Sequence, residues 1–331
     1  MVINELVQGF RIVGLANDEI EIRVVPQLGS KICSLRDRIA AREWMWQPPG
    51  PLRYFSNRTG DGFADSTLIG ADECLPSIAA CRWRNRELTD HGEAWTEAWD
   101  LDEDALVDQR VVTRLRLPIS PLEVERTIQL QKNRVQLNYE LRNIGDEPLE
   151  YLWALHPMMA IKDGDQLVLP SECNCVRLDA TVINCNLGGR GQTIRYPEPA
   201  SDVNLEFLEF GRKAAAVKFF TEPLSMGCAG LHNKLHGEYI VFSVDPQELN
   251  TFGVWINRGG WSDFHHVAIE PTNGAPDPLD SAVDEWKRFS SLLPAETRQW
   301  EVNIFLGTEL MSDHISYKEE FLSQFALSSL K

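Results

Sequence analysis

Apolar and polar side chains alternate with a period of two along much of this chain. The clearest case is segment 134–142, where apolar residues occupy every second position: Val135, Leu137, Tyr139 and Leu141. Similar strand signals occur in segments 19–24, 30–35, 124–130 and 300–306. Successive side chains of a strand point to opposite faces of a sheet, so the pattern predicts strands with one buried and one wetted face. Such strands are typical of antiparallel sheets.

Helical periodicity is confined to two short segments, 281–289 and 312–325. In the second, Ser312 or Asp313 is expected to cap a helix whose apolar side is formed by Ile315, Phe321, Leu322 and Phe325. Strands and helices do not alternate, which argues against a parallel α/β fold. The segment 188–204, rich in Gly, Pro and polar residues, predicts a long loop rather than a domain boundary. We therefore expect residues 1–331 to form one all-β domain, a sandwich of large antiparallel sheets with few short helices.

Composition and charge narrow the possible partners. The chain has 331 residues, 43% of them hydrophobic and 24% charged, as in ordinary globular proteins. Its 49 acidic and 32 basic residues give a net charge of -17, which disfavours nucleic acid and anionic membranes as partners. No apolar run approaches the ~18 residues of a membrane span, and no signal peptide is evident. Seven scattered cysteines indicate reduced thiols and a cytoplasmic location.

One titratable residue interrupts the apolar segment 151–161, Y-L-W-A-L-H-P-M-M-A-I: His156. Pro157 follows it and favours an extended backbone at His156. Alternation places His156 on one face with Ala154, whose small side chain leaves space beside the imidazole. A single histidine in such a strand is more often a core residue bonded to backbone. A functional interpretation therefore needs a second titratable group.

Segment 264–279, F-H-H-V-A-I-E-P-T-N-G-A-P-D-P-L, supplies that group. Glu270 ends an apolar strand, precedes Pro271 and shares a face with Ala268 and His266. A carboxylate in this position is costly to bury unless it is paired or used in chemistry. The simpler interpretation is a cap or ion-pair partner at the strand end. Two strands that each present one titratable group before a proline suit a cleft with an acid and a base.

Other polar and aromatic residues are candidates for substrate contacts. His91 precedes Gly92 in D-H-G-E-A-W, and Glu73 lies in G-A-D-E-C-L-P-S-I; a solvated turn is the ordinary interpretation of both. The segment W-I-N-R-G-G-W contains Trp255, Asn257 and Arg258. Indole rings pack on the C–H face of a sugar while amide and guanidinium groups bind hydroxyls. Core packing is the alternative explanation for these tryptophans.

The motifs L-W-A-L-H-P, V-A-I-E-P-T-N-G and D-H-G-E-A-W, by their order and spacing, resemble the aldose 1-epimerase (galactose mutarotase-like) family. The loop G-A-D-E-C-L-P resembles that of its glucose-6-phosphate 1-epimerase-like branch. The resemblance spans nearly the whole chain and implies a β-supersandwich, a sugar bound in an open cleft, and no cofactor or metal. It also implies that His156 is the general acid, Glu270 the general base and His91 a substrate-binding residue.

The sequence departs from that family pattern at two places. An arginine is common just after the H-G pair, whereas here Trp95 follows Ala94. The aspartate that commonly binds sugar hydroxyls between the two catalytic motifs has no clear counterpart; segment 231–239 offers His232, His236 and Glu238. Both differences leave the identity of the sugar, and its phosphorylation, open.

The implied chemistry is the exchange of anomers through ring opening. A base removes the proton of the anomeric hydroxyl while an acid protonates the ring oxygen. Ordinary pKa values of ~4.3 for Glu and ~6.5 for His allow a carboxylate base and an imidazolium acid to coexist near neutrality. Upward shifts of both pKa values would improve the match. The expected activity is that of an aldose 1-epimerase, a cofactor-independent isomerase.

Three alternatives remain at this stage. The first is a sugar-binding or regulatory protein that keeps the cleft without catalysis. The second is a glycosidase, which usually needs two facing carboxylates, whereas only Glu270 is evident. The third is a metalloenzyme using His265, His266 and Glu270. It is disfavoured because adjacent histidines on a strand point to opposite faces.

Overall fold

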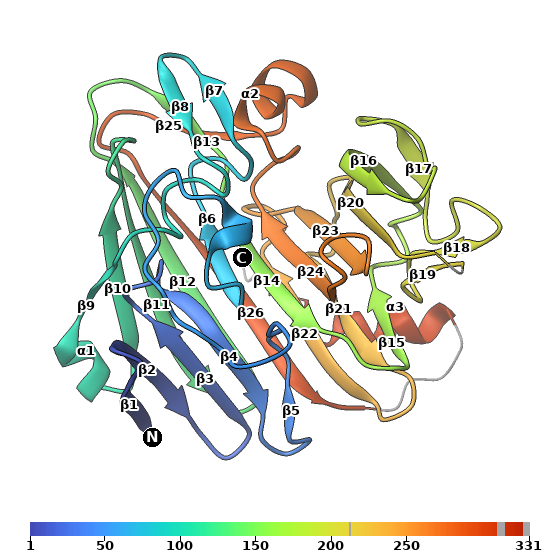
Figure 1. Ribbon diagram of the computed structural model, residues 1–331, viewed down its shortest axis with the longest axis horizontal. Coiled ribbons are helices and arrows are strands. Elements are labelled where there is room, and N and C mark those ends of the chain that lie inside the picture. Colours follow the sequence, from blue (N-terminus) through green and yellow to red (C-terminus); the bar gives the residue numbers. More distant parts are fainter. Residues whose placement is uncertain (212, 310–314, 327–331) are drawn as a thin grey trace.

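Two large antiparallel sheets contain most of the regular structure in the computed structural model, which describes residues 1–211, 213–309 and 315–326 (Figure 1). The larger sheet has the spatial order β1 (Val2–Val7), β2 (Phe10–Ala16), β3 (Ile20–Val25), β4 (Lys31–Asp37), β6 (Ala71–Cys74), β14 (Ala154–Ala160), β24 (His265–Thr272), β23 (Thr251–Arg258), β20 (Ala215–Thr221), β16 (Cys175–Ile183) and β17 (Thr193–Arg195), with β5 (Arg42–Glu43) paired to β4. The prediction of an all-β architecture is confirmed.

The smaller sheet has the order β15 (Asp165–Val168), β21 (Cys228–Asn233), β22 (Glu238–Val244), β26 (Thr297–Thr308), β12 (Arg134–Asn143), β11 (Leu122–Gln131), β10 (Val111–Arg116) and β9 (Asp100–Leu101). Among the described residues, three two-stranded sheets complete the strands: β7 (Cys81–Trp83) with β8 (Arg86–Leu88), β13 (Leu149–Tyr151) with β25 (Ser290–Leu292), and β18 (Val203–Asn204) with β19 (Glu209–Phe210). Every strand predicted from alternation is found, and most strand ends lie within one to three residues of their predicted positions.

Helical segments are short: α1 (Glu103–Val107), η1 (Phe63–Asp65), α2 (Leu279–Ser281), the π-helical turn η2 (Ala282–Trp286) and α3 (Ile315–Ser323). The helix predicted over 281–289 thus begins slightly earlier and ends at Trp286, where Lys287 adopts the left-handed conformation. The predicted caps of the last helix, Ser312 and Asp313, lie outside the described residues. Segment 188–204 is largely loop, with short strand pieces at β17 and β18. Within the described residues no helix is long and apolar enough to cross a membrane.

The largest apolar cluster joins side chains of both sheets. On β12 the alternating residues Val135, Leu137, Tyr139 and Leu141 are all buried in it, against Ile128 of β11 and Val302 of β26. The same cluster takes in Ile22 and Val24 of the larger sheet. One face of the larger sheet is therefore committed to the core, which leaves its other face for a site.

A buried polar network crosses this core and corrects one expectation. Glu73 of β6, predicted in a turn, is 1% exposed and accepts hydrogen bonds from Arg126 at 2.7 Å, from Tyr139 at 2.9 Å and from Trp153 at 2.9 Å. The strand register explains this, because Glu73 pairs with Leu155 and so shares its core-facing side. Glu73 therefore joins the two sheets and does not meet a ligand.

We expect Arg126→Met to lower the free energy of unfolding by roughly 3–5 kcal/mol, because it leaves the Glu73 carboxylate buried without its cation. Urea unfolding followed by circular dichroism measures this. The control is Arg114→Met, which removes a half-exposed partner of Asp102 and Glu125 and should cost less than about 1 kcal/mol. Equal costs for the two variants would contradict the structural role given to the network.

Candidate functional site

A cavity of about 320 Å³ lies on the face of the larger sheet that does not meet the smaller sheet. This volume falls in the range of small-molecule sites. Its polar lining comprises Asp90, His91, His156, Lys218, His266 and Asp277. Aromatic and apolar lining is supplied by Phe63, Met158, Trp255 and Trp261. The cavity thus combines apolar walls with convergent titratable groups.

Strand register brings His156 and Glu270 together. Strands β14 and β24 are neighbours (Figure 1). Ala154 pairs with Thr272 and Met158 with Ala268, so His156 lies across from Glu270. Nε2 of His156 lies 3.6 Å from Oε1 of Glu270. The His156 side chain is 8% exposed and lines the cavity, whereas the Glu270 side chain is 0% exposed and lies behind it. Among the described residues, Glu270 Oε1 and His156 Nδ1 have no hydrogen-bond partner.

The protonation state of His156 differs from the expectation. Burial lowers the pKa of His156 well below its ordinary 6.5, and the neighbouring His91 and the Lys218 cation lower it further. His156 is therefore a neutral imidazole near pH 7. The sequence-based idea of an upward shift and an imidazolium at neutrality was wrong, because it left out the depth of burial and Lys218.

Lys218 is a site residue that the sequence analysis missed. From β20 its ammonium group bonds to Oε2 of Glu270 and lies 3.4 Å from Oδ1 of Asp277. Burial opposes the charge, but the carboxylates of Asp277 and Glu270 outweigh it and raise the pKa of Lys218. The sequence did offer one signal for this residue: Lys218 is the single charged residue in the apolar segment 214–220, A-A-A-V-K-F-F. Its partner, 52 positions away, is not visible in that segment.

A glycine makes room for this ion pair. Gly253 of β23 lies between β20 and β24 and pairs with Glu270 on one side and Phe220 on the other. A Cβ atom at Gly253 would lie 2.9 Å from Oε2 of Glu270 and 3.4 Å from Nζ of Lys218. The missing side chain on the middle strand therefore lets Lys218 reach across it to the carboxylate.

Asp277 was also missed, although it follows Glu270 closely in the sequence. It lines the cavity with a side chain that is 21% exposed. Burial raises the pKa of Asp277 to about 8; Lys218 opposes the shift, and the charges of Asp179 and Glu270 reinforce it. Because Asp277 and Lys218 lie 3.4 Å apart, their titrations are linked. A second carboxyl group thus lies at the cavity beside the His156–Glu270 pair.

His91, which the family resemblance implies is a substrate-binding residue, lines the cavity. Its backbone is left-handed, with φ of 58°, and so is that of Gly92, where a Cβ would collide with Leu75 backbone. The imidazole stacks on Phe63 at 3.8 Å and meets the edge of His156 at 5.0 Å. Nδ1 of His91 lies 3.0 Å from Oδ1 of Asp90. This contact fixes the orientation of the ring at the cavity wall.

The W-I-N-R-G-G-W residues divide into lining and supporting groups. Trp255 lines the cavity and donates its Nε1 hydrogen to Nε2 of His266 at 3.2 Å. Asn257 is fully buried and bonds both backbone groups of Trp261, at 2.9 and 3.0 Å, so it positions that ring rather than a ligand. Arg258 does not line the cavity. Of the five residues expected to bind substrate, the structure places His91 and Trp255 in the cavity and Glu73, Asn257 and Arg258 outside it.

A metal site is not formed by the histidines near Glu270. His266 is buried at the cavity wall, whereas His265 is exposed on the opposite side of β24. Over the parts of the chain that the structure describes, no three His, Cys, Asp or Glu side chains are arranged to hold a metal ion.

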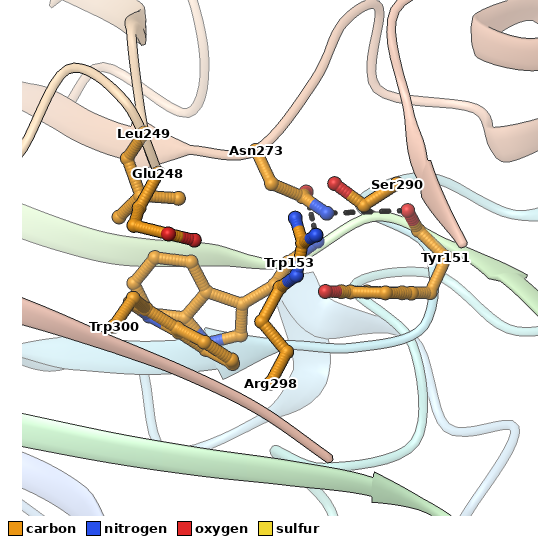
Figure 2. Close-up of a pocket in the computed structure, with 8 residues that line it drawn as sticks. All are labelled: Tyr151, Trp153, Glu248, Leu249, Asn273, Ser290, Arg298 and Trp300. Carbon is orange, nitrogen blue, oxygen red and sulfur yellow. Dashed lines mark hydrogen bonds between the residues drawn. The ribbon is translucent and has the colours of Figure 1, made fainter. Parts of the chain in front are cut away.

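A second, smaller hollow lies beside Tyr151 and Trp153, at the start of segment 151–161. It encloses about 10 Å³, roughly the room of one water molecule. Figure 2 shows Asn273 between Tyr151 and Trp153 at its rim. Asn273 accepts from the Trp153 backbone N–H at 2.7 Å and donates to the Tyr151 carbonyl at 3.3 Å. This amide ties the loop after β24 to the segment that leads into β14, the strand that carries His156.

Comparison with solved structures supports the fold assignment. The Slr1438 protein from Synechocystis sp. PCC 6803 matches with a TM-score of 0.65 and 16% identity, over 90% of this chain and 96% of that one. A candidate aldose 1-epimerase from Escherichia coli K12 matches with a TM-score of 0.64 and 13% identity, over 90% of this chain and 99% of that one. A galactose mutarotase-like protein from Lactobacillus casei ATCC 334 matches with a TM-score of 0.63 and 16% identity, over 89% of this chain and 100% of that one.

These similarities establish a galactose mutarotase-like fold for this chain. Neither a protein-family model nor a curated protein sequence matches it. At identities of 13–16% the comparisons show architecture, and the function has to be argued from the site.

His266 makes stability depend on pH. Burial, with a smaller effect of His265, lowers its pKa from 6.5 to about 4, so between these values the unfolded chain binds a proton that the folded chain does not. The stability from this group is complete above pH 6.5 and is lost as the pH falls toward 4, by on the order of 3 kcal/mol in total. Urea unfolding at pH 7, 6 and 5 should show a smaller decline for His266→Phe than for the wild type. Parallel declines would contradict the neutral, buried state of His266.

Proposed function

We propose that this chain is an isomerase that interconverts the α and β anomers of an aldose by acid–base opening and closure of the sugar ring. The observation that carries the proposal is the meeting of His156 and Glu270, 3.6 Å apart, at the base of a cavity of about 320 Å³. The fold adds support, because solved proteins that share it are named as aldose 1-epimerases or galactose mutarotase-like proteins. The chemistry requires no cofactor.

The geometry favours His156 as the group that touches the sugar. His156 lines the cavity and is neutral, so its free nitrogen lone pair can accept the proton of the anomeric hydroxyl. Glu270 lies behind the ring and stabilises the imidazolium that forms, as the carboxylate of a histidine–carboxylate dyad does. This differs from the roles that the family resemblance implied, in which Glu270 is the base and His156 the acid. The reason is that the Glu270 side chain has no exposed surface through which to reach a ligand.

The remaining cavity wall suits a sugar. The half-buried indole of Trp255 offers an apolar surface to the C–H face of a pyranose, and His91 offers a ring nitrogen to a hydroxyl. All seven cysteines are unpaired thiols, which supports a cytoplasmic location for the reaction.

One observation favours a second function, sugar binding without catalysis. His156 and Lys218 both lie between the cavity and the Glu270 carboxylate. A protein of this kind would bind a monosaccharide saturably and leave the exchange of anomers at its uncatalysed rate, as measured by exchange NMR. A glycosidase fits less well, because a fully buried Glu270 cannot face a glycosidic bond.

We expect His156→Ala and Glu270→Gln each to lower kcat by about a hundredfold or more, the usual contribution of a positioned proton transfer. Polarimetry of freshly dissolved aldoses, in free and phosphorylated forms, measures the rate. Glu248→Gln, which changes an exposed carboxylate at the rim of the second hollow, is the matched control and should keep the wild-type rate. Wild-type acceleration by both cavity variants would show that this pair is not the reacting site.

A further inference from the structure

The two indole rings that line the cavity, Trp255 and Trp261, differ in what they contact. The ring of Trp261 meets Phe264 edge-on with 5.7 Å between ring centroids, and His266 with 6.2 Å. In the part of the chain that the structure describes, no aromatic ring or cation stacks on Trp255, whose side chain is half-buried. Trp261 thus belongs to the packed wall, whereas Trp255 keeps ring surface available to a ligand.

Strand register places Trp255 beside a low point of the cavity floor. Trp255 on β23 pairs with Ala268 on β24, and Ala268 pairs in turn with Met158 on β14. Directly paired residues of an antiparallel sheet project to the same face. Trp255 and Met158 both line the cavity, and the small side chain between them is that of Ala268. The row therefore leaves room next to the indole.

His266 binds the edge of this indole. It lies two residues before Ala268 on β24 and is a diagonal neighbour of Trp255, within reach of large side chains. Nε1 of Trp255 donates a hydrogen bond to Nε2 of His266 at 3.2 Å. An indole N–H only donates, so Nε2 of His266 is the unprotonated nitrogen. Among the described residues Nδ1 of His266 has no hydrogen-bond partner, which leaves the bond from Trp255 as the one that the imidazole makes there.

The imidazole is itself held by packing. His266 is 1% exposed and lies between aromatic rings, with 5.0 Å to the ring centroid of Trp46 and 6.2 Å to that of Trp261. A ring enclosed at the density of a protein interior keeps one orientation. The acceptor for the Trp255 N–H is therefore fixed by the wall of the cavity.

We propose that His266 is a positioning residue for sugar binding, which fixes the Trp255 indole in advance as the stacking surface for the C–H face of a pyranose. This inference rests on the proposed function. An indole supplies a large apolar area to a ligand, and a side chain that is ordered before binding loses less conformational entropy when the ligand arrives. In this role His266 exchanges no proton with the sugar. It acts on the affinity for the sugar and not on the rate of ring opening.

The test measures sugar binding by isothermal titration calorimetry, with D-glucose, D-galactose, D-mannose and their 6-phosphates as probes. His266→Phe keeps a ring of similar shape and removes the acceptor. For the sugar that the wild type binds most tightly, it should raise Kd by roughly three- to tenfold and leave kcat within about twofold. His266→Gln, whose amide oxygen can accept from the indole, should restore most of the affinity. His265→Phe, on the exposed side of the same strand and outside the cavity lining, is the control and should bind as the wild type does.

A double-variant cycle shows whether His266 acts through Trp255. Trp255→Phe keeps an aromatic ring but has no N–H to donate. In that background His266→Phe should change Kd by less than about twofold, because the hydrogen bond that it breaks no longer exists. Effects of the two substitutions that simply multiply would show that His266 acts independently of Trp255, and this would overturn the proposed role.

A measurement without sugar separates this inference from the proposed function. In proton–nitrogen-15 NMR spectra, the indole N–H resonance that is absent in Trp255→Phe belongs to Trp255. It should shift in His266→Phe and return toward its wild-type position in His266→Gln. A wild-type protein that binds none of the six sugars overturns the proposed function, and the inference falls with it. A wild type that binds a sugar, together with a His266→Phe variant of unchanged Kd or unchanged indole resonance, overturns the positioning role alone.

Discussion

A carboxylate without any solvent exposure lies in the middle of the larger sheet, and the site depends on how its charge is compensated. Glu270 is neutralised by Lys218, which crosses the intervening strand where Gly253 has no side chain. A buried charge without a partner would cost several kcal/mol. Lys218 therefore supplies the positive charge that Glu270 needs. Burial keeps the imidazole of His156 neutral at the cavity wall, and the charges of His91 and Lys218 act in the same direction.

The same burial acts in opposite directions on neighbouring groups. Removal from water disfavours the charged form of any side chain, so it lowers the pKa of His156 and raises that of Asp277. Lys218 lies beside Asp277 and Glu270 and limits the net charge of the cluster. One local environment therefore shifts the pKa of an imidazole and that of a carboxyl group in opposite directions.

Two buried glutamates of the larger sheet have different structural roles. Glu73 and Glu270 both lie in strands of the larger sheet, and both are buried. The register pairs Glu73 with Leu155, on the face that packs against the smaller sheet, where Arg126 binds it. Glu270 lies across from His156 on the other face. The sheet thus uses one carboxylate to join the two layers and the other to support the site.

Alternation of side chains is a local property, so three features that depend on it could be predicted: the strands, the all-β architecture, and the faces of their own strands on which His156 and Glu270 lie. Helix ends, such as the early stop at Trp286, were less predictable because they depend on tertiary contacts. That Lys218 and Asp277 lie beside the His156–Glu270 pair could not be predicted, because strand register and burial set the contacts between positions far apart in the sequence. The protonation states could not be predicted for the same reason. A pKa depends on how deeply the group is buried and on the charges around it, and the tertiary structure sets both.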